Sequence, residues 1–244
     1  MYSSTSRLLT QLLLVIAMSS FIHAYDFERL NIPSLTSKIL ELKVDQTNWP
    51  KVNVPHEFEA VAKMYRWDQT SKKLQDQKSF GITKMSSKLN LIYQSWVSVK
   101  KDGSNQTDSI TMKNQTSQVQ YYYDTTQSNP CGEKLMTDNR TVQEIIDQWF
   151  DPNWTKNFAY AGQDFADWDK TQKYNRINVF DPAQGVGVSY FYTIDTGDMR
   201  YIAEYASAVT VYDFSLGFKA SNLTKSDFGI NECITKHLEI SFLQ

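Results

Sequence analysis

The sequence predicts a mostly β protein with minor α content, built as one antiparallel sheet of about ten strands with a single helix. Three observations lead to this fold class. Aromatic residues make up 14% of the chain, and aromatic side chains favour strands. Several segments alternate apolar and polar residues with period two, as a strand with one buried face does. Turn residues separate these segments, and we find no linker or repeat between them.

The predicted strands span nearly the whole chain after its first quarter. The clearest is 88–99, in which alternate residues from Leu89 to Val99 share one apolar face and Gln94 and Ser98 lie on the other. Asp102-Gly103 follows as a turn. The expected strands are 57–67, 78–85, 88–99, 108–113, 117–124, 156–162, 174–180, a hairpin over 187–205, and a last strand over about 208–218.

One helix interrupts the strands. Thr141 is a suitable N-cap and Glu144 follows three residues later, which is the capping-box pattern. Val142, Ile145, Ile146 and Trp149 then recur at helical spacing, and Asp151-Pro152 ends the segment.

Residues 1–24 are predicted to be a secretory signal peptide. Arg7 is the only charge before a leucine-rich run, and Ala24 is a small residue suited to precede the cleaved bond. Thr10 and Gln11 interrupt the run, which is shorter than the roughly 20 apolar residues of a spanning helix. An uncleaved N-terminal anchor is the alternative. We expect residues 25–244 to form one domain without a transmembrane segment, located outside the cell or in the lumen of a secretory or lysosomal compartment.

In an oxidising secretory compartment, cysteines can form disulfides and N-x-S/T triplets can be glycosylated. Cys131 and Cys233 are the two cysteines of the chain, and an isolated pair most simply forms one disulfide, the alternatives being free thiols or an intermolecular bridge. Candidate glycosylation sites begin at Asn105, Asn114, Asn139, Asn153 and Asn222.

The order of these features resembles the ependymin-related family and, more broadly, the LolA-like (lipoprotein-carrier-like) fold. The matching stretches are Phe58 to Trp67, Leu89 to Tyr93, Tyr121-Tyr122-Tyr123 before Cys131, and a C-terminal pattern of Trp168, the aromatic run 190–192, Asp213-Phe214 and Phe228 to Cys233. The chain lacks the extra N-terminal cysteines of most ependymins. The resemblance implies a strongly curved antiparallel sheet, a half-barrel wrapped around a hydrophobic cavity with one central helix.

The sequence shows no convincing active site, and we expect neither an enzyme nor a cofactor. His56 and His237 lie in no metal-binding spacing, and neither a G-x-S-x-G elbow nor a phosphate-binding loop occurs. The net charge of −2, without a basic stripe, argues against a nucleic-acid partner.

Two acidic motifs have a catalytic or metal-binding interpretation and a simpler one. Asp195-Thr196-Gly197 matches the aspartic-protease triplet, but no second such triplet follows, so a polar hairpin turn is the simpler interpretation. Asp164, Asp167 and Asp169 suggest weak calcium association, which has been attributed to ependymins, yet their spacing does not follow an EF-hand loop. Solvated aspartates beside a strand are the simpler interpretation.

The surplus of aromatic residues, together with the resemblance, favours an apolar pocket for a lipid or another hydrophobic ligand. The alternative is a structural or adhesive glycoprotein of an extracellular matrix or surface coat, and an aspartic-type hydrolase is a distant third. Period-two alternation predicts that the pocket is lined from one face of the sheet by Leu89, Leu91, Tyr93, Tyr121, Tyr123, Tyr190, Tyr192, Phe214 and Phe218.

Overall fold

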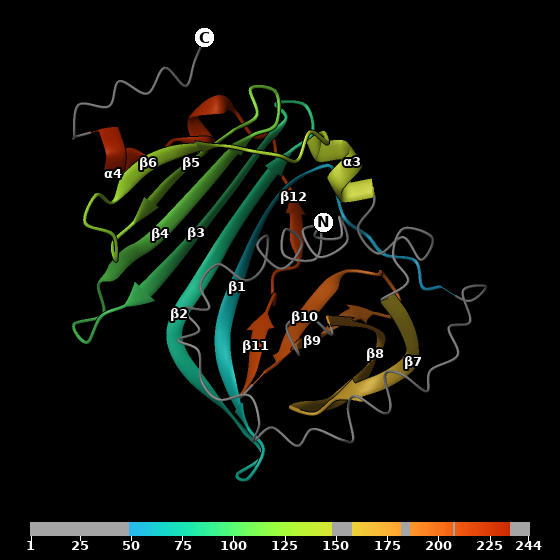
Figure 1. Cartoon of the computed structure of the whole chain (residues 1–244). Coiled ribbons are helices and arrows are strands. Elements are labelled where there is room, and N and C mark those ends of the chain that lie inside the picture. The colour runs from blue at the N-terminus through green and yellow to red at the C-terminus, as the bar shows by residue number, and fades with distance from the viewer. Residues whose placement is uncertain (1–48, 148–157, 182–185, 207, 235–244) are drawn as a thin grey trace.

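The described residues form one open antiparallel sheet of twelve strands (Figure 1). The computed structural model describes residues 49–147, 158–181, 186–206 and 208–234. The predicted signal peptide, Trp149, Asp151-Pro152, Asn153 and His237 lie outside these residues. The twelve-stranded sheet confirms the predicted mostly β fold class.

The strands run across the sheet in the order β6-β5-β4-β3-β2-β1-β11-β10-β9-β8-β7, and β12 pairs with β1 beside β11. Strands β1 to β6 pair in chain order, and so do β7 to β11, so that β6 and β7 lie at opposite edges of the sheet. β1 pairs with β11 and β12 and so connects the two halves. The strands are β1 (Glu57–Asp68), β2 (Lys73–Ser86), β3 (Leu91–Val99), β4 (Asn105–Asn114), β5 (Val119–Asp124), β6 (Cys131–Leu135), β7 (Phe158–Ala166), β8 (Asp169–Asp181), β9 (Val186–Thr193), β10 (Met199–Tyr205), β11 (Val209–Asp213) and β12 (Phe218–Ala220).

Every predicted strand occurs, but the sheet contains two more than expected. β6 was not predicted, because Cys131–Leu135 is short and largely polar at the sheet edge. The predicted last strand is broken into β11 and β12 at a turn in which Gly217 has a φ of +63°. A non-glycine residue rarely adopts this conformation, so the glycine marks the break.

The predicted helix forms as α3 (Val142–Asp147), but it is not central; its predicted end at Asp151-Pro152 lies outside the described residues. The Thr141 backbone N–H donates to Glu144 Oε2 at 2.7 Å, and the Glu144 N–H donates to Thr141 Oγ1 at 3.1 Å, so the capping box is present. α3 lies at one end of the sheet (Figure 1). The remaining helical segments of the described part, 3-10 helix η3 (Lys225–Phe228) and α4 (Asn231–Ile234), are near the C-terminus. The expectation of one central helix is wrong in this respect.

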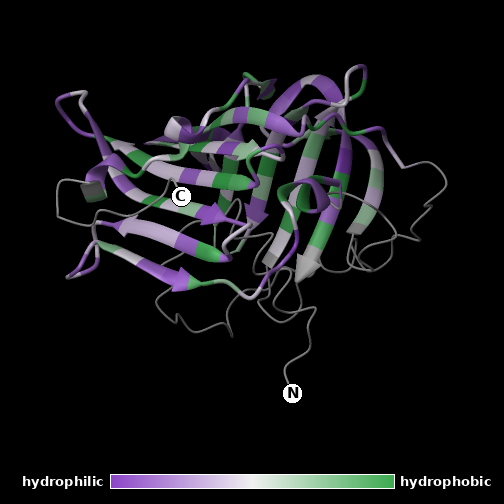
Figure 2. Ribbon diagram, turned by 90° about the horizontal axis from the view of Figure 1, so that it is seen from above, coloured by the Kyte–Doolittle hydropathy of each residue, from purple (hydrophilic) through white to green (hydrophobic). Residues whose placement is uncertain are grey.

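The sheet bends strongly between the half formed by β1 to β6 and the half formed by β7 to β11 (Figure 1). Its two faces carry different hydrophobic clusters. On the face that carries Phe58, Ile92, Tyr190 and Tyr212, which we call the inner face, one hydrophobic cluster joins strands of both halves to α3. The opposite, outer face carries two separate clusters, one around Phe191 in the C-terminal half and one beneath the C-terminal segment. Figure 2 shows the alternation of hydrophobic and hydrophilic residues along the strands that produces these two faces.

The C-terminal segment, residues 221–233, covers the outer face of the first half of the sheet. Leu223, Phe228 and Ile230 pack there against Leu91, Ile110 and Met112. Cys233 at its end forms a disulfide with Cys131 of β6, with the Cα atoms 5.8 Å apart. The predicted pairing is confirmed, and it ties this covering segment to the sheet edge.

Among the described residues, no helix is long and apolar enough to span a membrane.

Candidate ligand-binding face

Buried tyrosines dominate the inner face in the C-terminal half. Tyr190 lies between Ile177 and Ile202 on the neighbouring strands, and Tyr192 lies between Asn175 and Met199. Both tyrosines are almost fully buried. Burial raises the pKa of Tyr192 well above its ordinary value, so its hydroxyl is neutral at physiological pH.

A carboxyl group lies among these aromatic residues. Glu204 of β10 is on the inner face, and its Oε2 accepts a hydrogen bond of 3.0 Å from the Tyr212 hydroxyl. Its Oε1 is buried and has no hydrogen-bond partner among the described residues. Desolvation by burial raises the pKa of Glu204 to about 7, so its carboxyl is partly protonated at neutral pH.

Small residues lie at the middle of the inner face, and aromatic rings cover them. Ala62 on β1 pairs with Gly81 on β2, and Gly81 pairs with Trp96 on β3. A Cβ atom at position 81 would lie 3.2 Å from the Trp96 ring, so the indole rests directly on the glycine. Phe218 stacks in parallel on Phe58 at 4.7 Å between ring centroids. The described part of this face is therefore closely packed at its centre.

The inner face becomes polar toward β6. Gln94, Thr111, Lys113 and Gln120 lie on this face of β3, β4 and β5, and each is at most 8% exposed. The alternation in 88–99 predicted an apolar face and a polar face; the first is correct, but the second also carries Ile92 and Trp96, which pack in the inner apolar cluster. The structure adds that the polar face is buried as well, since Ile92 and Gln94 are as inaccessible as Leu91.

The nine residues predicted to line one pocket lie on both faces of the sheet. Tyr190, Tyr192 and Phe214 are buried on the inner face, and Phe218 packs against them. The other five lie on the outer face, where Leu91 is buried and partly buried side chains surround it, namely Leu89, Tyr93, Tyr121 and Tyr123.

The prediction that all nine share one face is therefore wrong. Alternation within each strand was assigned correctly, as the separation of Phe191 from its neighbours Tyr190 and Tyr192 illustrates. The error arose between strands, because the register across β1 and β11 decides which face of one half is continuous with which face of the other. In the first half, the apolar face identified from the sequence is the one covered by the C-terminal segment.

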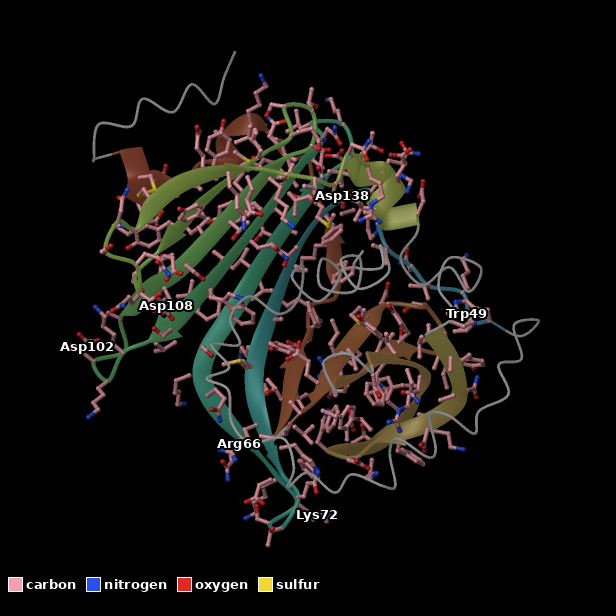
Figure 3. All side chains as sticks on the ribbon, in the orientation of Figure 1. Trp49, Arg66, Lys72, Asp102, Asp108 and Asp138 are labelled. Carbon is pink, nitrogen blue, oxygen red and sulfur yellow. A yellow bond between two sulfur atoms is a disulfide. The ribbon has the colours of Figure 1, made fainter. Side chains whose placement is uncertain are left out.

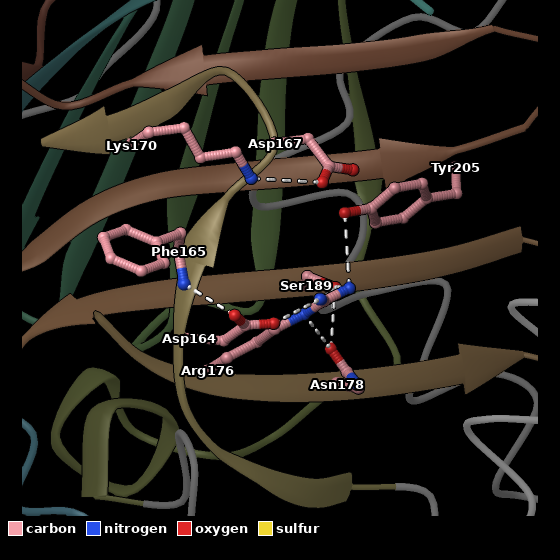
Figure 4. Close-up of polar contacts among 8 residues, drawn as sticks. All are labelled: Asp164, Phe165, Asp167, Lys170, Arg176, Asn178, Ser189 and Tyr205. Carbon is pink, nitrogen blue, oxygen red and sulfur yellow. Dashed lines mark hydrogen bonds and ion pairs between the residues drawn. The ribbon is translucent and has the colours of Figure 1, made fainter. Parts of the chain in front are cut away.

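A polar network on the outer face is fully paired (Figure 4). Arg176 donates to Asn178 Oδ1 at 3.0 Å and to Ser189 Oγ at 3.1 Å, and its guanidinium lies 3.9 Å from Asp164. The Ser189 hydroxyl also donates to Asn178 Oδ1 at 2.7 Å. Because these bonds satisfy the buried Asn178 and Ser189 side chains, the network stabilises β8 against β9.

The three aspartates considered for calcium have separate partners within the chain. Asp164 lies beside Arg176, and Asp167 is 3.7 Å from Lys170. Asp169 accepts hydrogen bonds from the Tyr174 hydroxyl at 2.5 Å and the Tyr201 hydroxyl at 3.0 Å, and such bonds help to lower its pKa to about 2 against the opposing effect of desolvation. The described residues contain no group of three or more acidic, histidine or cysteine side chains placed to hold a metal ion.

Asp195-Thr196-Gly197 forms the hairpin turn between β9 and β10, as the simpler interpretation predicted. The Gly197 N–H donates to the Thr193 carbonyl at 3.0 Å, and the Thr196 hydroxyl donates to Asp198 Oδ2 at 2.6 Å. The Asp195 side chain is exposed. His56 is likewise exposed, and its Nε2 lies 2.7 Å from Asp147 Oδ1, which fastens α3 to the start of β1.

Four of the five candidate glycosylation sites lie within the described residues. Asn105, Asn139 and Asn222 are exposed. Asn114 is half-buried, and its Oδ1 accepts hydrogen bonds from the Thr116 and Ser117 backbone N–H groups.

Two charged residues on the inner face were not identified from the sequence. Glu204 follows Ile202 and Ala203, and its placement on the same face as Ile202 is visible in the alternation of that strand. Lys113 gave no comparable indication, because the polar residues around it in sequence are typical of an exposed strand edge.

Comparisons with known proteins add little to this description. No protein-family model and no curated protein sequence matches the chain. Among solved structures, two crystal forms of PNGF-II, in space groups C2 and P21, align with 9% identity and TM-scores of 0.40 and 0.38. The alignments cover 72% of this chain and 30% of the PNGF-II chain. A likeness at this level defines neither a fold family nor an activity.

Proposed function

We propose that this protein is a secreted glycoprotein that binds a lipid or another hydrophobic ligand on the inner face of its sheet and does not transform it. We also propose that the protein is related to the ependymin-related, LolA-like proteins, in which the sheet is a half-barrel around a hydrophobic cavity. The observation that carries it is the single apolar cluster that unites both halves of a bent, one-layer sheet.

The physical argument rests on curvature. A flat sheet buries an apolar face against a second layer, whereas the described inner face is covered by the six-residue helix α3 at one end and by Trp49, Val52 and Val54 of the segment before β1. An acyl chain inserted among these aromatic residues would gain about 0.8 kcal/mol per buried methylene, which offsets the loss of ligand freedom for a long chain. The unpaired Glu204 Oε1 adds a buried polar group that a ligand hydroxyl would satisfy.

The alternative function, a structural or adhesive coat glycoprotein, is favoured by a different observation. Trp96 already rests on Gly81, and Phe218 stacks on Phe58 of the same inner cluster. If side chains fill the whole concave side, no ligand is needed there.

Titration with neutral fatty alcohols of increasing chain length distinguishes the two functions. We expect affinity to rise with chain length in native mass spectrometry. Ala62→Phe places a ring on the inner face and should weaken binding, whereas Val61→Phe, which adds the same ring to the outer face one residue away, should not. No binding at any length by a folded wild-type protein would leave the coat glycoprotein as the remaining function.

A further inference from the structure

One row of residues crosses six strands of the inner face and changes character at its middle. Successive pairs in register connect Phe58, Met85 and Ile92 to Lys113, Gln120 and Lys134. The first three side chains are at most 1% exposed members of the inner apolar cluster. Since neighbouring strands lie about 4.8 Å apart, the apolar half of the row spans roughly 10 Å before the first charge.

That first charge, Lys113, is buried without a counter-ion. Its side chain is 8% exposed. Within the described ranges, no carboxylate lies within ion-pair distance of its ammonium and no acceptor is hydrogen-bonded to it. Desolvation lowers the pKa of Lys113 to about 8, so the group still carries a proton at pH 7. A buried charge without a partner is costly, and proteins retain such groups mainly at functional sites.

The surroundings of Lys113 have an excess of positive charge. Lys134 and Arg140 both oppose its protonation, and Asp138 favours it. Asp138, however, is engaged by the Arg140 side chain through bonds of 2.8 Å and 2.6 Å. Figure 3 shows Asp138 at the α3 end of the sheet. Among these four side chains, three cations therefore face one anion that is already paired.

Polar uncharged groups complete the polar end of the face. Gln120 lies directly opposite Lys113 on β5, and Thr111 and Gln94 form a pair in the next row. Tyr122 lies against Gly132, where a Cβ atom would be 2.3 Å from its hydroxyl oxygen. The glycine thus leaves room for the ring to lie flat at the border of this polar patch.

From this arrangement we infer that Lys113 is the centre of an oxyanion-binding site that takes the head group of an anionic amphiphile, with the apolar tail directed along the row toward Phe58. The inference rests on the proposed function, because it names the class of hydrophobic ligand. A carboxylate or phosphate oxygen at Lys113 would supply the missing counter-ion, and the exposed Lys134, opposite Gln120 on β6, would add a second cation.

Palmitic acid and hexadecanol, which share a chain length and differ in head-group charge, test the site. We expect the wild-type protein to bind the acid at least about tenfold more tightly, the effect of one hydrogen bond to a charged group. Lys113→Met should abolish this preference by lowering the affinity for palmitic acid to that for hexadecanol. Lys100→Met, which removes an exposed lysine from the turn between β3 and β4, should behave as wild type.

Equal binding of the acid and the alcohol by the wild-type protein would overturn the oxyanion site and leave the proposed function intact. If neither binds, the proposed function fails. The site is then tested by NMR, with inorganic phosphate added to wild-type protein that carries isotope-labelled methyl groups on its lysines. A phosphate-dependent shift of the Lys113 resonance would support a site for free oxyanions, and an unchanged resonance would overturn it. The same measurement decides the matter if Lys113→Met does not fold.

Discussion

The Tyr212 hydroxyl donates a 3.0 Å hydrogen bond to Glu204 Oε2, and this bond joins β11 to β10 across the inner face. The second oxygen of the carboxyl is buried without a donor in the described part of the chain. Tyr190 is also near enough for its ionisation to be coupled to that of Glu204. The carboxyl therefore lies in surroundings that favour its neutral form.

Glu204→Gln should make stability less dependent on pH. The pKa of Glu204 is raised from 4.5 to about 7, so the folded state binds more protons than the unfolded state between these values, and wild-type stability falls as pH rises through this window. Above pH 7 the variant should be more stable by up to about 3 kcal/mol. Urea denaturation at pH 5 and pH 8 measures the difference. Glu133→Gln, at an exposed position, serves as the control, and parallel pH profiles for wild type and Glu204→Gln would contradict the prediction.

Lys113→Met should stabilise the protein at neutral pH, because it replaces a buried cation with an apolar side chain of similar length. The pKa of Lys113 is lowered from 10.5 to about 8, so the cost of its charge is fully present below pH 8 and disappears as pH rises toward 10.5. We expect a gain of up to about 3 kcal/mol at pH 7 that shrinks by pH 10. A loss of stability at pH 7, measured by denaturant unfolding, would show that the ammonium has a stabilising partner.

Replacing both Cys131 and Cys233 with alanine should cost about 2–5 kcal/mol of unfolding free energy. The disulfide closes a sequence separation of 102 residues and holds the C-terminal segment on the outer face. Thermal or urea unfolding measures the loss, and a reducing agent should destabilise the wild type but not the double variant. Two alkylatable thiols in the native protein would refute the pairing.

Gly197→Ala should destabilise the protein more than Gly103→Ala does. Both glycines have positive φ, +74° and +83°, so alanine costs about 1 kcal/mol at either position from backbone strain. At position 197 the added Cβ would also lie 2.5 Å from the Lys51 carbonyl oxygen, whereas nothing lies within 4 Å at position 103. We expect the first variant to lose at least about 1 kcal/mol more, and equal losses in denaturant unfolding would contradict the close contact.

Local patterns were enough to predict most of the fold. Alternation located β1, β3 and the β9–β10 hairpin, and the glycine-containing turns at Asp102-Gly103 and Asp195-Thr196-Gly197 were correctly placed between strands. The capping box at Thr141 marked the start of α3. Each of these features depends on interactions between residues a few positions apart, which a sequence displays directly.

The candidate site depended on information that the sequence does not display. Lys113 and Ile92 lie on consecutive strands, and only the exact register of β3 with β4 makes them neighbours at the border of the apolar region. Glu204 and Tyr212 are both visible as alternating residues, but the burial of the carboxyl follows from the bend that brings the two halves of the inner face into one cluster.

The sequence by itself determined the β class, most strand and turn positions, the start of the helix and the pair of cysteines able to bond. Alternation, turn chemistry and the number of cysteines can be read directly from the sequence. The tertiary structure decided which face of each half became the inner one and which charges were buried on it. The physical reason is that a strand has two faces of comparable apolar character here, and only pairing across β1 and β11, together with the C-terminal cover held by Cys233, decides which face meets the other half.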